Sequence, residues 1–162
     1  MPDSKHILFL VGAGASKDAG LPMAVELTDW LIKDIESQRP KLLPLIRFVH
    51  GGICFGRGCR GRNPSDRVNI EEFLIACHDL SCRSNSSVYP FVSAWHERLA
   101  DIGKLPGEYS TDGKIDAFDY LLDYSKDRLR DWLTPKDPSK AKYFWSLLEF
   151  LERKYHLHIF TL

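Results

Sequence analysis

The sequence predicts an α/β domain that combines a parallel sheet with a long, largely helical stretch. Apolar runs of strand length stand near both ends of the chain, at 7–11 and 157–162. A glycine-rich turn follows the first run, and amphipathic patterns of helical period fill most of the sequence between the two. With 162 residues and 44% apolar content, the chain is long enough for one sizeable core and too short for two ordinary domains.

The first predicted unit, residues 5–36, is a strand, a loop and a helix. Ile7 to Val11 is a continuous apolar run that ends at a glycine, which is typical of a strand buried on both faces of a parallel sheet. After the loop, Pro22 suits the first turn of a helix. A stripe at helical spacing supports that helix, and its members are Leu21, Val25, Thr28, Ile32 and Ile35.

Residues 37–155 are predicted to form a largely helical insertion. Signals are weak after Ser37, and the stretch HGGICFGRGCRGRNPSD predicts a long glycine-rich loop. Asn69 is a good N-cap for a helix that runs to about Leu80. Further helices are predicted at 88–102, 115–133 and 138–155, and residues 156–162 then return to the sheet as a second strand.

Two strands are few for a parallel sheet, and more than a hundred largely helical residues separate them. A second strand at the end of the chain would leave a sheet edge and half a core exposed. We therefore interpret residues 1–162 as the N-terminal part of one larger α/β domain.

The composition favours a cytoplasmic protein without membrane contact. Lys+Arg and Asp+Glu are both 22, so no overall charge draws the chain to nucleic acid or to an anionic membrane. The apolar run at 7–11 is far shorter than the roughly 20 residues that span a bilayer. Lys5, this run and Ala13-Gly14-Ala15 mimic a secretory signal, but Asp3 interrupts the basic start and the helical pattern continues past the supposed cleavage site. The four cysteines are then expected to be reduced.

The loop after the first strand is suited to an anion. Glycines let a backbone approach a ligand closely, and the start of the following helix presents free N–H groups and a positive dipole end. A phosphate or pyrophosphate group is the expected ligand. The P-loop pattern is absent because no Gly-Lys stands at the required spacing, and Lys17 stands where the common dinucleotide fingerprint needs glycine or alanine.

A more specific pattern is Gly12-Ala13-Gly14-Ala15-Ser16, followed after three residues by Gly20-Leu21-Pro22. It resembles the opening motif of the sirtuin-like superfamily, whose members bind NAD and break its nicotinamide–ribose bond. The resemblance implies a Rossmann-like sheet with NAD lying over the loop. It also implies roles for the motif. Backbone N–H groups of Gly12, Ala13 and Gly14 would contact the phosphates. Ser16, which follows the cofactor-binding residue Ala15, would add its hydroxyl at the start of the helix, and Gly20, Leu21 and Pro22 would wall the nicotinamide side.

The sequence departs from the sirtuin deacetylases in two respects. Their Phe-Arg does not follow Pro22, where the chain reads Met23-Ala24, and no C-x-x-C pair is present. The pattern is more similar to the sirtuin-like domains of bacterial defence proteins, which hydrolyse NAD. Residues 158–162 resemble the strand that leads into the family's catalytic Asn, so Thr161 is expected to contact the cofactor. The catalytic Asn and His are then expected after Leu162, and no catalytic residue is expected in this chain.

The resemblance implies that the complete domain hydrolyses NAD to nicotinamide and ADP-ribose, as an antiphage defence effector. A non-catalytic nucleotide-sensing or protein-interaction module is the alternative, and a protein deacetylase is less favoured because of the missing motifs. The family also suggests a homo-oligomer, with downstream domains or defence partners.

Four cysteines, in the pairs Cys54/Cys59 and Cys77/Cys82, could supply thiolates to zinc. Cys77 falls on the apolar face of its predicted helix, however, where a buried thiol is ordinary packing, so we do not expect a zinc site.

A basic stretch contains Arg57, Arg60, Arg62 and Arg67. We interpret it as a solvated loop, and leave open a nucleic-acid contact through the first three. The six histidines are interpreted as structural or exposed. The aromatic residues at helical positions, among them Phe73, Phe118, Trp145 and Phe150, are interpreted as core or subunit packing.

Overall fold

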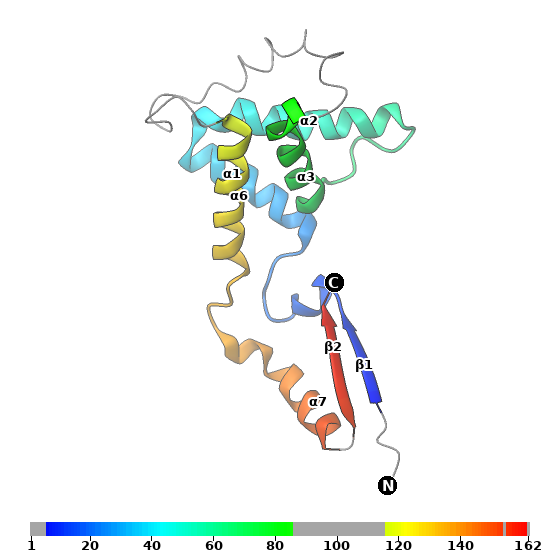
Figure 1. Ribbon diagram of the computed structural model, residues 1–162. Coiled ribbons are helices and arrows are strands. Elements are labelled where there is room, and N and C mark those ends of the chain that lie inside the picture. Colours follow the sequence, from blue (N-terminus) through cyan, green and yellow to red (C-terminus); the bar gives the residue numbers. More distant parts are fainter. Residues whose placement is uncertain (1–5, 86–115, 154, 162) are drawn as a thin grey trace. The chain divides into compact units, whose positions relative to one another are not determined.

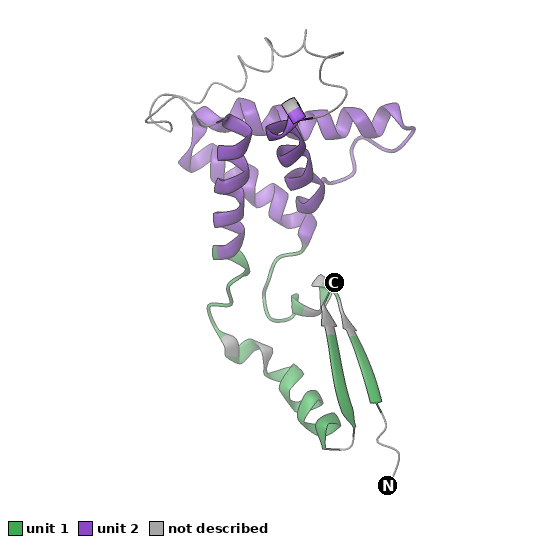
Figure 2. Cartoon of the chain, in the orientation of Figure 1, with its two compact units in different colours: residues 1–23, 131–162 green, residues 24–130 purple. Residues whose placement is uncertain are grey.

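The computed structural model describes residues 6–85, 116–153 and 155–161 (Figure 1). The chain divides into two compact units (Figure 2). Unit 1 comprises residues 1–23 and 131–162, and unit 2 comprises residues 24–130. The described part is mostly helical and contains one small parallel sheet. The structure thus combines helices with a parallel sheet, as the predicted α/β class requires.

Unit 1 contains the sheet. Strands β1 (His6–Val11) and β2 (His156–Thr161) pair in parallel, in a register that runs from His6 opposite His156 to Val11 opposite Thr161. Both predicted strands are therefore confirmed: β1 begins one residue before the predicted run at 7–11, and β2 both begins and ends one residue before the run at 157–162. Helix α7 (Lys142–Glu152) comes before β2 in the chain and contacts it (Figure 1).

The described apolar side chains of unit 1, apart from Pro22, are exposed or half-buried. Leu8 is 72% exposed and Ile159 is 51% exposed, and the register places them on opposite faces of the sheet. On α7, Trp145 is 62% and Phe150 is 57% exposed, so these two aromatics are not core residues of the described unit. Strands with continuous apolar runs are those that larger parallel sheets bury on both faces.

Unit 2 is a helical cluster with its own core. Its elements are α1 (Ala24–Gln38), α2 (Leu43–Cys59), α3 (Ile70–Ser81) and most of α6 (Ala117–Leu133), with short 3₁₀ turns η2 (Pro40–Leu42) and η3 (Arg83–Asn85). The fully buried side chains come from all four helices, and the largest include Leu31, Ile35, Ile46, Phe73, Phe118 and Leu121. Burial of Phe73 and Phe118 confirms their interpretation as packing residues.

Polar caps explain where several helices begin. Asn69 Oδ1 accepts a hydrogen bond from the Glu71 N–H at 2.9 Å, which confirms the predicted N-cap of α3. Asp116 Oδ1 accepts from the Phe118 N–H at 2.8 Å at the start of α6. Asp137 Oδ1 accepts from the Ser139 N–H at 3.0 Å and opens the turn η5 (Pro138–Ala141) that leads into α7. The helix predicted at 115–133 is thus confirmed from Ala117 onward, and the helix predicted at 138–155 is confirmed over Lys142–Glu152, after the 3₁₀ turn η5.

The prediction of a long glycine-rich loop at 50–66 is wrong in its first part. Helix α2 continues to Cys59, and residues 60–69 alone connect it to α3. Glycine in a helix costs about 1 kcal/mol relative to alanine. Here the buried side chains of Leu45, Ile46 and Val49 anchor the helix, and tertiary packing outweighs that cost.

Helix α1 also differs in detail from its prediction. It begins at Ala24, two residues after Pro22. Its buried residues are Leu27, Thr28, Leu31 and Ile35, a face rotated from the predicted stripe. The helix predicted at 88–102 lies outside the described residues. Within the described residues, no helix is both long enough and apolar enough to cross a membrane.

Candidate functional site

The predicted nucleotide loop starts at the carboxyl end of β1. Gly12 is extended, and residues Ala13–Ser16 form the 3₁₀ turn η1. Gly20 has a φ of +85°, a left-handed conformation that strongly favours glycine, and its N–H donates to the Lys17 carbonyl at 2.8 Å. The Leu21 N–H donates to the Ser16 carbonyl at 3.3 Å. This last bond ties the two halves of the sequence motif together in one loop.

Gly12 and Gly14 lie on the open side of this loop. Both are exposed, and a Cβ atom added to either would meet no other atom within 4 Å. Neither has a positive φ. Backbone strain and crowding in the described chain therefore do not require glycine at these two positions. What the missing side chains provide is unobstructed access to the backbone.

The sheet brings Thr161 to the end of the strand pair from which the glycine loop starts. Because Thr161 pairs with Val11 in parallel register, the carboxyl end of β2 lies beside the start of the loop. In parallel α/β sheets this edge is where ligands bind. Of the remaining motif residues, Leu21 is half-buried and Pro22 is buried.

A cation that the sequence motif does not contain lies close to the loop. Lys140 of η5 places Nζ 3.8 Å from where a Cβ atom of Gly20 would stand. An ammonium group at this position adds positive charge to a loop proposed to hold phosphates. Sequence reasoning missed Lys140, because it lies 120 residues further along the chain than Gly20, and no local pattern connects the two.

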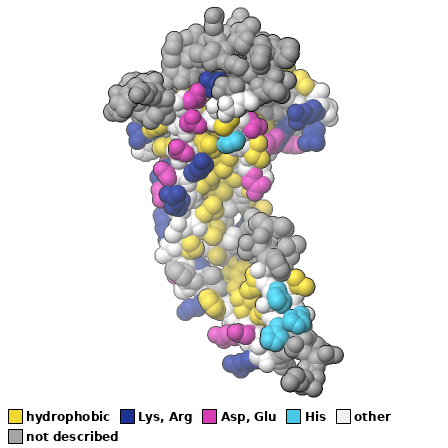
Figure 3. Space-filling view, viewed as in Figure 1, with side chains coloured by type: hydrophobic (Ala, Val, Ile, Leu, Met, Phe, Trp, Pro, Cys, Tyr) yellow, Lys and Arg dark blue, Asp and Glu magenta, His cyan; other side chains and the backbone are white. Residues whose placement is uncertain are grey.

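Three histidines come together on the sheet. His6 Nδ1 lies 3.1 Å from His158 Nε2, and the His6 ring stacks on those of His156 and His158 with centroid distances of 5.3 and 5.4 Å. Figure 3 shows histidine side chains gathered on the surface of this part of the molecule. All three are exposed, as expected. Their clustering was not predicted, since it follows from the strand register.

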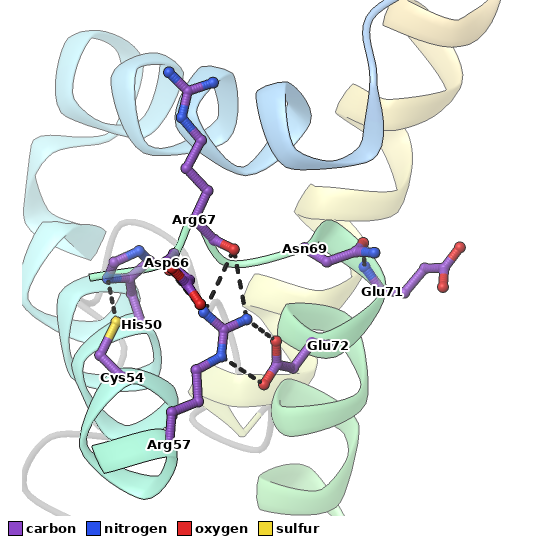
Figure 4. Close-up of polar contacts among 8 residues, drawn as sticks. All are labelled: His50, Cys54, Arg57, Asp66, Arg67, Asn69, Glu71 and Glu72. Atoms are coloured by element: carbon purple, nitrogen blue, oxygen red, sulfur yellow. Dashed lines mark hydrogen bonds and ion pairs between the residues drawn. The ribbon is translucent and has the colours of Figure 1, made fainter. Parts of the chain in front are cut away.

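One arginine of the basic stretch is bound to neighbouring residues and largely shielded from solvent, which was not predicted. Arg57 lies in the last turn of α2, its side chain is 14% exposed, and it hydrogen-bonds to both carboxylate oxygens of Glu72 (Figure 4). It also donates to the carbonyls of Asp66 at 2.7 Å and Arg67 at 3.4 Å. The hydrogen bond with Glu72 raises the pKa of Arg57 above its ordinary value. The interpretation of Arg57 as a solvated loop cation is therefore wrong, whereas Arg60 and Arg62 are exposed.

A cavity of about 470 Å³ lies in unit 2, between α2 and α3. Its walls are mostly apolar and include Phe48, Ile53, Gly56, Ile75 and Leu80, with Arg60 among the polar residues. None of the predicted nucleotide-binding residues lines it. The cavity is thus a feature separate from the glycine loop.

The cysteines do not gather into one centre. Cys54 Sγ lies 3.9 Å from His50 Nδ1, and Cys82 Sγ lies 3.8 Å from His78 Nε2, each within one helical turn. Cys77 is buried, and burial raises the pKa of its thiol to about 12. Among the described residues, no group of three or more His, Cys, Asp or Glu side chains is arranged to hold a metal ion.

Comparison with known proteins adds no further evidence on the site. No family model matches the sequence, and no curated protein or solved structure is significantly similar to it. The functional interpretation of the loop therefore depends on its sequence motif and on the geometry described above.

Proposed function

We propose that residues 1–162 are the N-terminal part of a sirtuin-like, Rossmann-like NAD-binding domain, and that the complete domain hydrolyses NAD to nicotinamide and ADP-ribose. The observation that carries this proposal is the open glycine loop at the carboxyl edge of a parallel strand pair. Phosphates in parallel α/β proteins are bound at such edges, by backbone N–H groups that glycine leaves accessible.

Two cations near the loop would favour an anionic ligand, with Asp18 as the carboxylate next to one of them. Lys140 Nζ stands beside Gly20, and Lys17 directly follows the 3₁₀ turn η1. The pyrophosphate of NAD would lie against Gly12, Ala13 and Gly14, where a side chain at Gly14 would obstruct it. Thr161 would approach the ligand from β2, at the same edge of the sheet.

The hydrolysis step requires more than binding. Nicotinamide leaves C1′ of the ribose through an oxocarbenium-like transition state, and an ordered water adds to that carbon while a base takes its proton. The described loop would hold the dinucleotide in place. An Asn that orients the water and a His that accepts its proton are what the complete domain would have to add to this loop.

Isothermal titration of the 162-residue chain with NAD tests the binding half of this proposal. We expect Gly14→Val to abolish binding and leave the far-UV circular dichroism unchanged, because a Cβ at this position meets no atom of the described residues within 4 Å. Gly51→Val is the matched control, since Gly51 is also exposed and uncrowded but lies in α2. Undiminished affinity in a folded Gly14→Val chain would refute the assignment.

Hydrolysis needs its own measurement on the complete protein. Release of nicotinamide from NAD, followed by chromatography, would support the hydrolase proposal. If the complete protein binds NAD and leaves it intact, the nucleotide-sensing module is the better description.

A further inference from the structure

Three imidazole rings share one face of the sheet in unit 1, toward the amino ends of the strands. His6 pairs with His156 across the sheet, and His158 follows two residues later on β2. Alternate residues of a strand point to the same face, so all three rings project together. Each is exposed to solvent. The cluster is well separated along the strands from the glycine loop, which follows Val11 at the other end of β1.

The nitrogen atoms of two of these rings are spaced as metal ligands would be. His6 Nδ1 and His158 Nε2 are 3.1 Å apart. Imidazole nitrogens bind zinc at about 2.0–2.1 Å, so two nitrogens at this separation would subtend about 97° at a shared ion. That angle lies between the square-planar and tetrahedral arrangements that copper and zinc adopt. Because both rings are exposed, small side-chain rotations can direct the two lone pairs at one ion without disturbing a core.

We propose that His6 and His158 form a bidentate site for a divalent transition-metal ion of the zinc or copper type. His156, whose ring stacks on that of His6, lies beside this pair and is not counted as a ligand, and water would complete the coordination. A hydrogen bond between the two rings needs one proton held between their nitrogens. When the ion binds, the donating ring would carry this proton on its other nitrogen, so that both facing nitrogens present lone pairs to the ion.

Such an ion would join the two strands. His6 and His158 are 152 residues apart in sequence and belong to β1 and β2 respectively. A ligand that binds the folded chain and not the unfolded one stabilises the fold. The metal would thus reinforce the strand pair that positions the loop. The site is independent of the proposed NAD binding, since it shares no residue with the loop.

Zinc titration of the untagged chain, in a non-chelating buffer, tests the site. The pairs His50/Cys54 and His78/Cys82 could also chelate zinc, so the background chain carries Cys54→Ser and Cys82→Ser. In this background we expect one zinc ion per chain by isothermal titration. His158→Gln should weaken binding roughly tenfold or more, because one of two protein ligands is lost. His78→Gln, another exposed histidine change, is the control and should leave the affinity unchanged.

Nuclear magnetic resonance of the histidine rings gives a second readout that requires no mutation of the cluster. In the chain that carries Cys54→Ser and Cys82→Ser, zinc should shift the ring signals of His6 and His158 and leave those of His50 and His78 in place. Absence of zinc binding in the background chain would overturn the proposal, as would equal affinity in a folded His158→Gln chain. If His158→Gln alters the fold, unshifted His6 and His158 signals at saturating zinc overturn it. Titration with NAD in the absence of zinc separates this outcome from any failure of the proposed nucleotide site.

Discussion

Arg128 of α6 holds the carboxylate of Asp34 on α1 with two hydrogen bonds, from Nε to Oδ2 at 3.0 Å and from Nη2 to Oδ1 at 2.6 Å. Tyr124, one turn earlier on α6, donates its hydroxyl to Oδ2 at 2.5 Å. The Asp34 side chain is only 12% exposed, so these charge-assisted bonds are partly shielded from water. One carboxylate thereby fastens the last helix of unit 2 to the first.

Removing this carboxylate should destabilise unit 2. Asp34→Ala leaves Arg128 and Tyr124 without their shared acceptor, and we expect the free energy of unfolding to fall by about 2–3 kcal/mol. Urea denaturation followed by circular dichroism measures the change. Glu36→Ala on the same helix is the control, because its pair with Arg47 is well exposed and should contribute less than about 1 kcal/mol. Equal effects of the two variants would contradict the assigned role of Asp34.

The Tyr124 hydroxyl makes stability depend on pH in the alkaline range. Burial, followed by the hydrogen bond to Asp34, raises the pKa of Tyr124 from 10.0 to about 12. The folded chain therefore holds this proton more tightly than the unfolded chain does, so the stabilisation is complete below pH 10 and is lost as the pH rises to about 12. Urea unfolding at pH 9 and pH 11 should show a smaller loss in Tyr124→Phe than in the unmodified chain. The same loss in both chains would show that Tyr124 is not the titrating group.

The Cys77 thiol should be inert in the folded chain. Its side chain is fully buried, and burial raises its pKa from 9.0 to about 12, so almost none of the reactive thiolate is present at pH 8. We expect a disulfide reagent to modify the exposed Cys59 rapidly and Cys77 only after denaturation. Mass spectrometry of the modified chain identifies the sites. Comparable labelling rates at the two cysteines under native conditions would be incompatible with the described packing.

Two arginines of the basic stretch should differ sharply in their effect on stability. Arg57→Ala removes the hydrogen bonds to Glu72 and to the Asp66 and Arg67 carbonyls, and we expect a loss of about 1–2 kcal/mol. Arg60→Ala changes an exposed side chain and should lie within about 0.5 kcal/mol of the unmodified chain. Thermal unfolding of both variants provides the comparison. A larger loss from Arg60→Ala would reverse our interpretation of the stretch.

Short sequence patterns predicted those elements that depend mainly on residues adjacent in the sequence. The apolar runs at both ends of the chain are strands, and Asn69 caps the helix that follows it. The glycines of α2 gave a misleading signal, because the burial of Leu45, Ile46 and Val49 that stabilises this helix depends on other helices. Propensity alone could not have shown that those contacts exist.

The candidate site likewise has features that the sequence shows and features that depend on the folded structure. The glycine motif and its position after a strand can be read from the sequence, whereas the pairing of Thr161 with Val11 and the approach of Lys140 to Gly20 depend on contacts between distant residues. The salt bridge of Arg57 and the histidine cluster are further cases, since each joins residues from different elements.

The central claim is that the glycine loop binds NAD, and backbone amide resonances of the chain during an NAD titration test it most directly. We predict that the largest shifts occur at residues 12–16 and at Thr161, with smaller shifts near Lys140. Unchanged resonances at millimolar NAD, or shifts confined to α2 and α3 around the cavity, would contradict the account.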